Sequence, residues 1–306
     1  KGIPHVLLPA LEFMSIDAED EPRLDQIRVK LRQLLDRYPE TDLFITQGYI
    51  CRNAKGEVDN LKRGGSDYTA SLVAAAIQAS VCEIWTDIDG MHNNDPRIVK
   101  KTIPVEQLSF DEAAELAYFG AKNLHPTCIW PAQQQNVPVK LLNTMQPKAA
   151  GTVIQKTASA SGVKAIAAKD RIIAINIKSS RMLLAYGFLR KIFEVFEKYK
   201  TSIDMVTTSE VAVSVTIDNG SSLKNILKEL EPFGTTEVEH DQTIVSIVGN
   251  QIAATEDVLG RLFDGLSHVP VRMVSYGGSK HNVSVLIPSA FKAETLQELN
   301  RKLFGL

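Results

Sequence analysis

The first half of the chain alternates between helical spacing of apolar residues and short apolar runs. Residues 25–38 carry apolar side chains on one helical face, and Pro39 ends that helix. Ser109 and Glu112 have the spacing of a capping box at the start of a further helix. We expect helices over residues 66–80 and 110–119, and strands over residues 42–46, 81–86 and 137–142. This alternation predicts an α/β fold whose parallel sheet has helices on both faces.

The pattern changes after residues 151–162, where Thr, Ala, Ser and Gly predict a linker. Beyond it a βαββαβ order is written about twice, which is typical of ferredoxin-like modules. The expected strands are 171–178, 202–209, 211–217, 243–249, 271–276 and 282–287, and the expected helices are 187–200, 223–230, 256–266 and 293–304. The expected domains are residues 1–150, a linker over 151–162, a strand segment over 163–178 shared with the second module, a first module over 179–239 and a second over 240–306.

Composition narrows the class of protein. The chain has 306 residues and a formal net charge of −2, which gives no electrostatic footprint for nucleic acid or an anionic membrane. Its apolar runs are far shorter than the roughly 18 residues of a membrane span. Three scattered cysteines predict free thiols in a reducing, cytoplasmic setting and neither a disulfide framework nor a zinc site. The chain begins with lysine, so its natural amino terminus is an open question.

The segment Arg63-Gly64-Gly65-Ser66-Asp67 joins a polar loop to a predicted helix. Two glycines let backbone N–H groups approach a ligand, and a helix N-terminus favours an anion. Arg63 adds a planar fork suited to a carboxylate or phosphate. The alternative is an ordinary turn in which Ser66 or Asp67 caps the helix.

Two further loops follow predicted strands, at the sheet edge where open parallel sheets bind ligands. One begins at Gln47-Gly48, and the other runs from Thr86-Asp87 to the Asp95-Pro96-Arg97 turn. Together these loops favour a cleft of nucleotide size over solvated turns. Farther along, Lys122 lies just past a helix end, and His125 precedes a proline, a place where a structural role is the commoner one.

Four motifs in order resemble those of the aspartokinase family, most closely its monofunctional, lysine-sensitive members. They are RGGSDYTA from Arg63, WTDIDG with DPR from Trp85, FGAKNLHP from Phe119 and VTTSEVAVSVTID from Val206. The resemblance covers essentially the whole chain. It implies the C-terminal portion of an amino-acid-kinase-fold domain followed by two ferredoxin-like ACT domains.

The resemblance also implies an activity. Aspartokinases transfer the γ-phosphate of ATP, with Mg²⁺ as co-substrate, to L-aspartate, which is the first step of lysine, threonine and methionine biosynthesis. No tightly bound cofactor and no resident metal are implied. By the match, Asp67 is the catalytic residue, and Tyr49, Arg63, Gly64, Gly65 and Ser66 hold aspartate. The nucleotide is held by Thr86, Asp87, His92, Arg97, Lys122 and Asn123, with His92 at the position of a stacking tyrosine in some relatives.

Feedback inhibition is implied as well. The segment before the first helix of the first module and the strand after it resemble the lysine site of the family, which forms between two copies of that module. The implied effector residues are Met182, Ala185, Gly187, Phe188, Leu189, Ile203, Asp204, Thr208, Ser209 and Glu210. Threonine stays open as an alternative effector. The implied assembly is a homodimer through the first ACT module, with a dimer of dimers as the effector-bound alternative.

Two family motifs are missing from the sequence. Aspartokinases begin with a K-F-G-G-[ST]-S strand and turn that grips the phosphates, and a later glycine-glutamate turn binds the substrate ammonium. Lys1-Gly2-Ile3-Pro4 lacks the second glycine and the hydroxyl residue. We therefore expect that the chain starts partway through the kinase domain.

Three other functions stand beside this one. A non-catalytic regulatory ACT subunit would keep little of the kinase domain, whereas about half of this chain matches it. Kinases of the same fold for acetylglutamate or uridylate lack tandem ACT modules. A bifunctional aspartokinase–homoserine dehydrogenase would continue into a G-x-G-x-x-G dinucleotide fold, which the 306 residues do not contain.

The missing motifs lead to a first prediction. The 306-residue chain on its own should show no aspartate kinase activity, because the phosphate-gripping turn is not in it. A coupled assay of ADP release by the purified chain measures this. Turnover that depends on aspartate would contradict the prediction.

Overall fold

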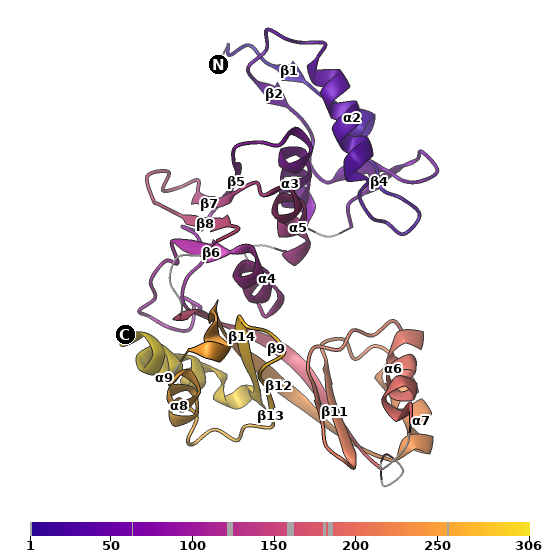
Figure 1. Ribbon diagram of the computed structural model, residues 1–306, viewed down its shortest axis with the longest axis vertical. Coiled ribbons are helices and arrows are strands. Elements are labelled where there is room, and N and C mark those ends of the chain that lie inside the picture. The colour runs from indigo at the N-terminus through magenta and orange to yellow at the C-terminus, as the bar shows by residue number, and fades with distance from the viewer. Residues whose placement is uncertain are drawn as a thin grey trace. The chain divides into compact units, whose positions relative to one another are not determined.

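The structure is a computed structural model that describes the chain except residues 1, 63, 121–124, 158–161, 180–181, 183–185 and 256. The chain divides into two compact units (Figure 1). The first unit contains Lys1–Asn93 and Ile103–Ala160, and the second contains Asn94–Thr102 and Ser161–Leu306.

The first unit is an α/β layer structure. Its strands are β1 (Val6–Leu7), β2 (Phe44–Ile45), β3 (Ile50–Arg52), β4 (Val58–Asn60), β5 (Cys82–Thr86), β6 (Gln107–Ser109), β7 (Val139–Asn143) and β8 (Thr152–Gln155). Its helices are α1 (Ala10–Phe13), α2 (Leu24–Leu35), α3 (Gly65–Ile77), α4 (Phe110–Tyr118) and α5 (Pro126–Gln135). The helices predicted over residues 25–38, 66–80 and 110–119 are confirmed, as is the capping box of Ser109 and Glu112.

The main sheet of this unit is mixed, and not wholly parallel as expected. The strand order is β5-β7-β8-β6, in which β5–β7 and β6–β8 are parallel but β7–β8 is antiparallel. The prediction of a linker over residues 151–162 is therefore wrong for its first part, because β8 lies inside the sheet. Only Thr152 and Ile154 of β8 are buried, so the strand has too few buried apolar residues to be predicted from the sequence pattern.

Helix α5 is an element that the sequence pattern did not predict. Pro126 opens it and Pro131 lies inside it, and a proline inside a helical segment normally argues against a helix. The helix packs along α3, where the Ser71 hydroxyl accepts a hydrogen bond from the Ala132 N–H at 3.3 Å. The side chain of Cys128 in α5 is almost completely buried.

The second unit is built on one six-stranded antiparallel sheet. Its strands are β9 (Gly162–Lys178), β10 (Val206–Thr208), β11 (Ala212–Ile217), β12 (Thr235–Asn250), β13 (Met273–Ser275) and β14 (Asn282–Pro288). Its helices are α6 (Phe188–Lys198), α7 (Leu223–Leu230), α8 (Val258–Gly265) and α9 (Lys292–Phe304), with short 3-10 turns η2 (Glu231–Phe233), η3 (Ile252–Ala254) and η4 (Ser289–Phe291). Among the residues that the structure describes, no helix is long and apolar enough to cross a membrane.

Two long strands, β9 and β12, run through both βαββαβ modules (Figure 1). The strand order is β10-β11-β9-β12-β14-β13. The second half of β9 pairs with β11 and with the first half of β12, and this completes the first module. The first half of β9 pairs with the second half of β12, so the second module takes its fourth strand from residues that precede the first module.

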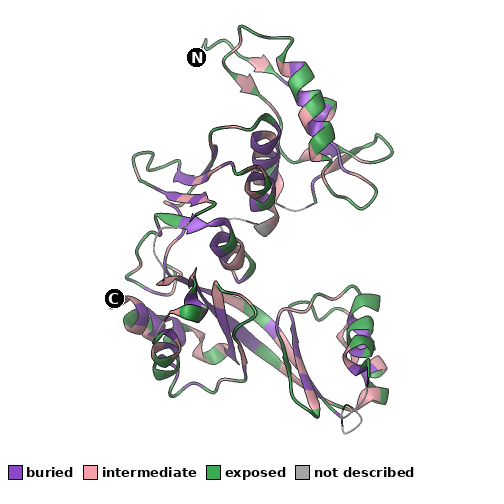
Figure 2. Ribbon diagram, in the orientation of Figure 1, coloured by how far each residue is buried: buried purple, intermediate pink, exposed green. Residues whose placement is uncertain are grey.

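Each module has its own hydrophobic core between helices and sheet. Ile192, Val195 and Phe196 of α6 pack with the inner residues of the first module, whereas Leu296 and Leu299 of α9 pack with those of the second. Figure 2 shows buried residues along both long strands and along one side of each helix. The two cores are therefore separate, although the backbone hydrogen bonds of the sheet are continuous.

The segment 94–102 belongs to the second unit, although its neighbours in sequence lie in the first. Val99 is buried in the core of the second module. The amide of Asn94 donates to the Leu296 carbonyl at 3.0 Å, and the amide of Asn300 donates to the Lys101 carbonyl at 3.0 Å. Helix α9 therefore holds the segment that carries Arg97.

Gly249 gives a test of the shared strands. A Cβ added there would lie 2.1 Å from the Gly162 carbonyl oxygen, so Gly249→Ala must push β9 away from β12. We expect a loss of about 2 kcal/mol in the free energy of unfolding, as for an overpacked core. Denaturant unfolding measures this, with Gly278→Ala as control because nothing lies within 4 Å of its added Cβ. Equal midpoints for the two variants would contradict the account.

Candidate functional site

The turn before α3 has the backbone that an anion site needs. Gly64 has φ 75° and Gly65 has φ 53°, in the left-handed region that glycine favours. Gly64 is the N-cap of α3, and none of the described side chains makes a capping hydrogen bond there. The alternative in which Ser66 or Asp67 caps the helix is therefore wrong. Arg63 lies outside the described residues.

A second turn packs directly against the first. A Cβ added to Gly48 would lie 2.8 Å from the Ser66 Cβ, so the glycine allows the two backbones to touch. Next to it, Tyr49 has φ 74°, and its N–H donates to the Thr69 hydroxyl of α3 at 2.8 Å. Its side chain is 43% exposed. The structure thus brings Tyr49 to the same place as Gly64, Gly65, Ser66 and Asp67.

Asp67 is a partly buried carboxylate in the first turn of α3. Burial raises its pKa, while a long contact of 3.5 Å with the Ser66 hydroxyl acts in the opposite direction. A carboxylate in such a place gains stability from a neighbouring cation. Asp67 can therefore pair with a cation brought to this turn.

Thr86 and Asp87 lie at the carboxyl end of β5, in the same unit as the glycine turn. The Thr86 hydroxyl donates to the Asp87 carboxylate at 3.0 Å, and the Thr86 carbonyl accepts from the Thr144 N–H at 2.8 Å. Asp87 is exposed. The backbone of this strand end is therefore held by the chain after β7, while the Asp87 carboxylate is accessible to a ligand.

Of the other predicted nucleotide-binding residues, His92 and Arg97 already contact acidic side chains of the chain itself. The His92 ring lies 2.8 Å from the Asp89 carboxylate and lowers its pKa, so this ring is held by a partner. Arg97 lies in the second unit and forms a bidentate pair with Asp95 at 2.9 and 2.7 Å, which lowers the pKa of Asp95. Lys122 and Asn123 lie outside the described residues. No group of three or more metal-ligating side chains occurs in the described part of the chain.

The predicted effector residues divide by burial. Phe188 is buried in the core of the first module, and Met182, Leu189 and Ile203 pack against that core. Gly187, with φ 75°, is the exposed N-cap of α6. Thr208, Ser209 and Glu210 are exposed at the end of β10, and Ala185 lies outside the described residues.

Asp204 already has a cation within its own chain. The Lys169 ammonium lies 2.6 Å from the Asp204 carboxylate and 2.9 Å from that of Asp218. Burial lowers the pKa of Lys169, but the two carboxylates raise it more, so the net direction is upward. The Asp204 side chain is 1% exposed. Of the two predicted acids, only Glu210 is exposed to a ligand from outside.

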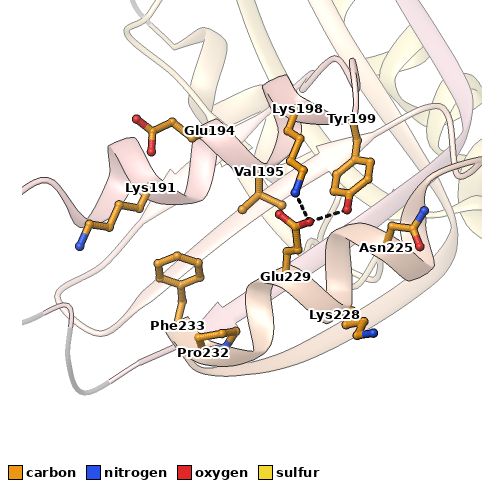
Figure 3. Close-up of a pocket in the computed structure, with 10 residues that line it drawn as sticks. All are labelled: Lys191, Glu194, Val195, Lys198, Tyr199, Asn225, Lys228, Glu229, Pro232 and Phe233. Carbon is orange, nitrogen blue, oxygen red and sulfur yellow. Dashed lines mark hydrogen bonds and ion pairs between the residues drawn. The ribbon is translucent and has the colours of Figure 1, made fainter.

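A cavity of about 800 Å³ lies between α6 and α7 (Figure 3). Glu229 crosses it, accepting hydrogen bonds from the Lys198 ammonium and the Tyr199 hydroxyl, each at 2.5 Å. These bonds lower the pKa of Glu229. The described residues that line this cavity include none of the predicted effector residues.

Sequence reasoning missed the residues beneath the glycine turn. A Cβ added to Gly64 would lie 2.4 Å from the Cys128 Sγ and 3.6 Å from the Thr127 hydroxyl. The only signal in the sequence is the place of both residues directly after His125-Pro126, in the helix that the prolines concealed.

Two known protein families match this chain, one in each of the two units. The amino acid kinase family matches residues 1–143, and an ACT domain family matches residues 245–303. The lysine-sensitive aspartokinase 3 of Escherichia coli is 37% identical over 281 residues, which are 89% of this chain and 62% of that protein. The chain therefore spans less than two thirds of the length of this curated relative.

Two solved structures of Escherichia coli aspartokinase III are also similar. The complex with aspartate and ADP has a TM-score of 0.87 at 34% identity, and the match covers 98% of this chain and 70% of that one. The complex with lysine and aspartate has a TM-score of 0.82 at 34% identity, covering 99% and 70%. The similarity thus extends through both units.

Proposed function

The chain belongs to the aspartokinase family, and from this premise we propose that the complete protein phosphorylates L-aspartate. The complete protein here means this chain with any segment that precedes or follows it. In the proposed reaction a side-chain carboxylate oxygen of aspartate attacks the γ-phosphorus of ATP. The bond between that phosphorus and the β–γ bridging oxygen breaks, and the products are 4-phospho-L-aspartate and ADP.

The observation that carries this proposal is the meeting of two turns at the start of α3. Gly48 against Ser66 places Tyr49 beside the left-handed Gly64-Gly65 turn. The first N–H groups of a helix have no partner within the helix and favour an anion. This place suits a carboxylate of aspartate, with the Arg63 guanidinium as a second donor by the family resemblance.

The charged residues have separate proposed roles. Phosphoryl transfer needs positive charge where charge spreads over the phosphate oxygens, and Lys122 and Arg97 would supply it. Thr86, Asp87 and Asn123 would contact the nucleotide, whose Mg²⁺ is a co-substrate. Asp67 would orient Lys122 and the metal ion. His92 would contact the nucleotide with its ring held by Asp89.

Regulation by L-lysine and a homodimer through the first ACT module complete the proposal. The relative from Escherichia coli is named for its lysine sensitivity, and one of its structures holds lysine. In this chain β10 ends the hydrogen-bonded strand order, and its three residues are all exposed. Such an edge is suited to pairing with a second copy. The buried free thiols fit a cytoplasmic protein.

Asp67 provides the test of the activity. In the complete protein, Asp67→Asn should lower kcat at least about 100-fold, because the charge that orients the reacting groups is lost while the shape is kept. Lys122→Ala should mainly raise the KM for ATP, by roughly ten-fold, through loss of one charge-assisted contact. Steady-state ADP release measures both. A near-normal kcat for Asp67→Asn would show that Asp67 has only a structural role.

Glu210 provides the test of the effector. Calorimetry should show saturable binding of L-lysine, and Glu210→Gln should weaken it roughly ten-fold by removing one charged partner of the ligand ammonium. Glu231→Gln, at another exposed acid of the same module, is the control and should bind lysine normally. Saturable binding of threonine without any heat from lysine would overturn the choice of effector.

A further inference from the structure

Cys128 lies directly beneath the glycine turn of the proposed aspartate site. Its side chain is 1% exposed, and the thiol Sγ lies 3.5 Å from the Gly64 carbonyl oxygen, to which it donates. A Cβ at Gly64 would lie only 2.4 Å from Sγ, well inside van der Waals contact. The sulfur atom therefore fills the space that a side chain at position 64 would need.

The start of α5 holds this sulfur in a fixed position. The His125 ring accepts a hydrogen bond from the Thr127 N–H at 3.3 Å and lies 2.8 Å from the Thr127 hydroxyl. The Cys128 N–H donates to the His125 carbonyl at 2.9 Å. One helical turn later, the Ala132 N–H donates to Ser71 of α3, so α5 cannot slide along α3 without breaking that bond.

The thiol is a packing and donor group and not a nucleophile. Burial raises the pKa of Cys128 to about 12, and the negative charge of Asp67 acts in the same direction. The sulfur therefore keeps its proton at neutral pH and can donate it to the Gly64 carbonyl. The contribution of this thiol to the turn therefore comes from its size and its hydrogen bond and not from its reactivity.

We propose that Cys128 is a positioning residue, whose thiol supports the Gly64-Gly65 turn so that the first N–H groups of α3 face the aspartate carboxylate. This inference rests on the proposed function. The support acts through contact of Sγ with the Gly64 backbone and through the thiol–carbonyl hydrogen bond. Gly64 and Cys128 therefore form one steric unit, in which a change at one position alters the effect of a change at the other.

The experiment is a double-mutant cycle in the complete protein, with Gly64→Ala, Cys128→Ala and the double variant. Cys128→Ala should raise the KM for aspartate roughly five-fold with little change in kcat or in the KM for ATP, because the turn moves but the nucleotide residues do not. Cys128→Ser keeps a donor at this place and should restore most of the loss. Gly64→Ala should cost far more in the wild-type background than in the Cys128→Ala background, where no Sγ opposes the added methyl group.

Cys51→Ala is the control, since Cys51 is equally buried but lies in β3. It should leave the KM for aspartate unchanged. An unchanged aspartate KM in Cys128→Ala, or equal effects of Gly64→Ala in both backgrounds, would overturn the inference. Wild-type protein without any aspartate-dependent turnover would instead contradict the proposed function. In that case, thermal unfolding of the wild type, the two single variants and the double variant would test the contact between Gly64 and Cys128. Shifts in Tm that add up in the double variant would contradict that contact.

Discussion

The proposed site depends on the close approach of three chain segments around the first turn of α3. Gly48 lies against Ser66, and Gly64 lies against Cys128, with no room for a Cβ at either glycine. The left-handed φ of Gly64 and Gly65 turns the chain into the helix without a capping side chain. Because none of the described side chains caps it, this helix start is suited to an anionic ligand. Tyr49, Asp67 and the underlying α5 take their places from this same packing.

The second unit depends on a different constraint, the sharing of two long strands. β9 and β12 each contribute one half to each module, so the second module takes one strand of its sheet from residues that precede the first module. Their cores are separate, yet their backbone hydrogen bonds are continuous. The segment that carries Arg97 is held by Asn300 and Leu296 of α9 in the second module. These hydrogen bonds link α9 to the segment of a residue that we propose to contact ATP.

The four motifs identified the family and, through it, the ACT domains. Amphipathic spacing over ten or more residues is a strong signal, and it predicted the α/β order and most of the long elements. It missed α5, since Pro126 and Pro131 outweigh its helical pattern, and it placed a linker where β8 has only two buried side chains. It could not find the contact of Cys128 with Gly64, which joins residues far apart in sequence. Nor could it show that Lys169 pairs with Asp204, because these two residues are far apart in the sequence and meet only in the folded chain.

The most direct test of the central claim is hydrogen–deuterium exchange on the complete protein, with and without L-aspartate, in the presence of MgADP. If the first amides of α3 bind the substrate carboxylate, the peptide that contains residues 64–68 should exchange more slowly when aspartate is added, while β13 and β14 stay unchanged. Aspartate-dependent protection elsewhere in the first unit, with none at residues 64–68, would contradict the account.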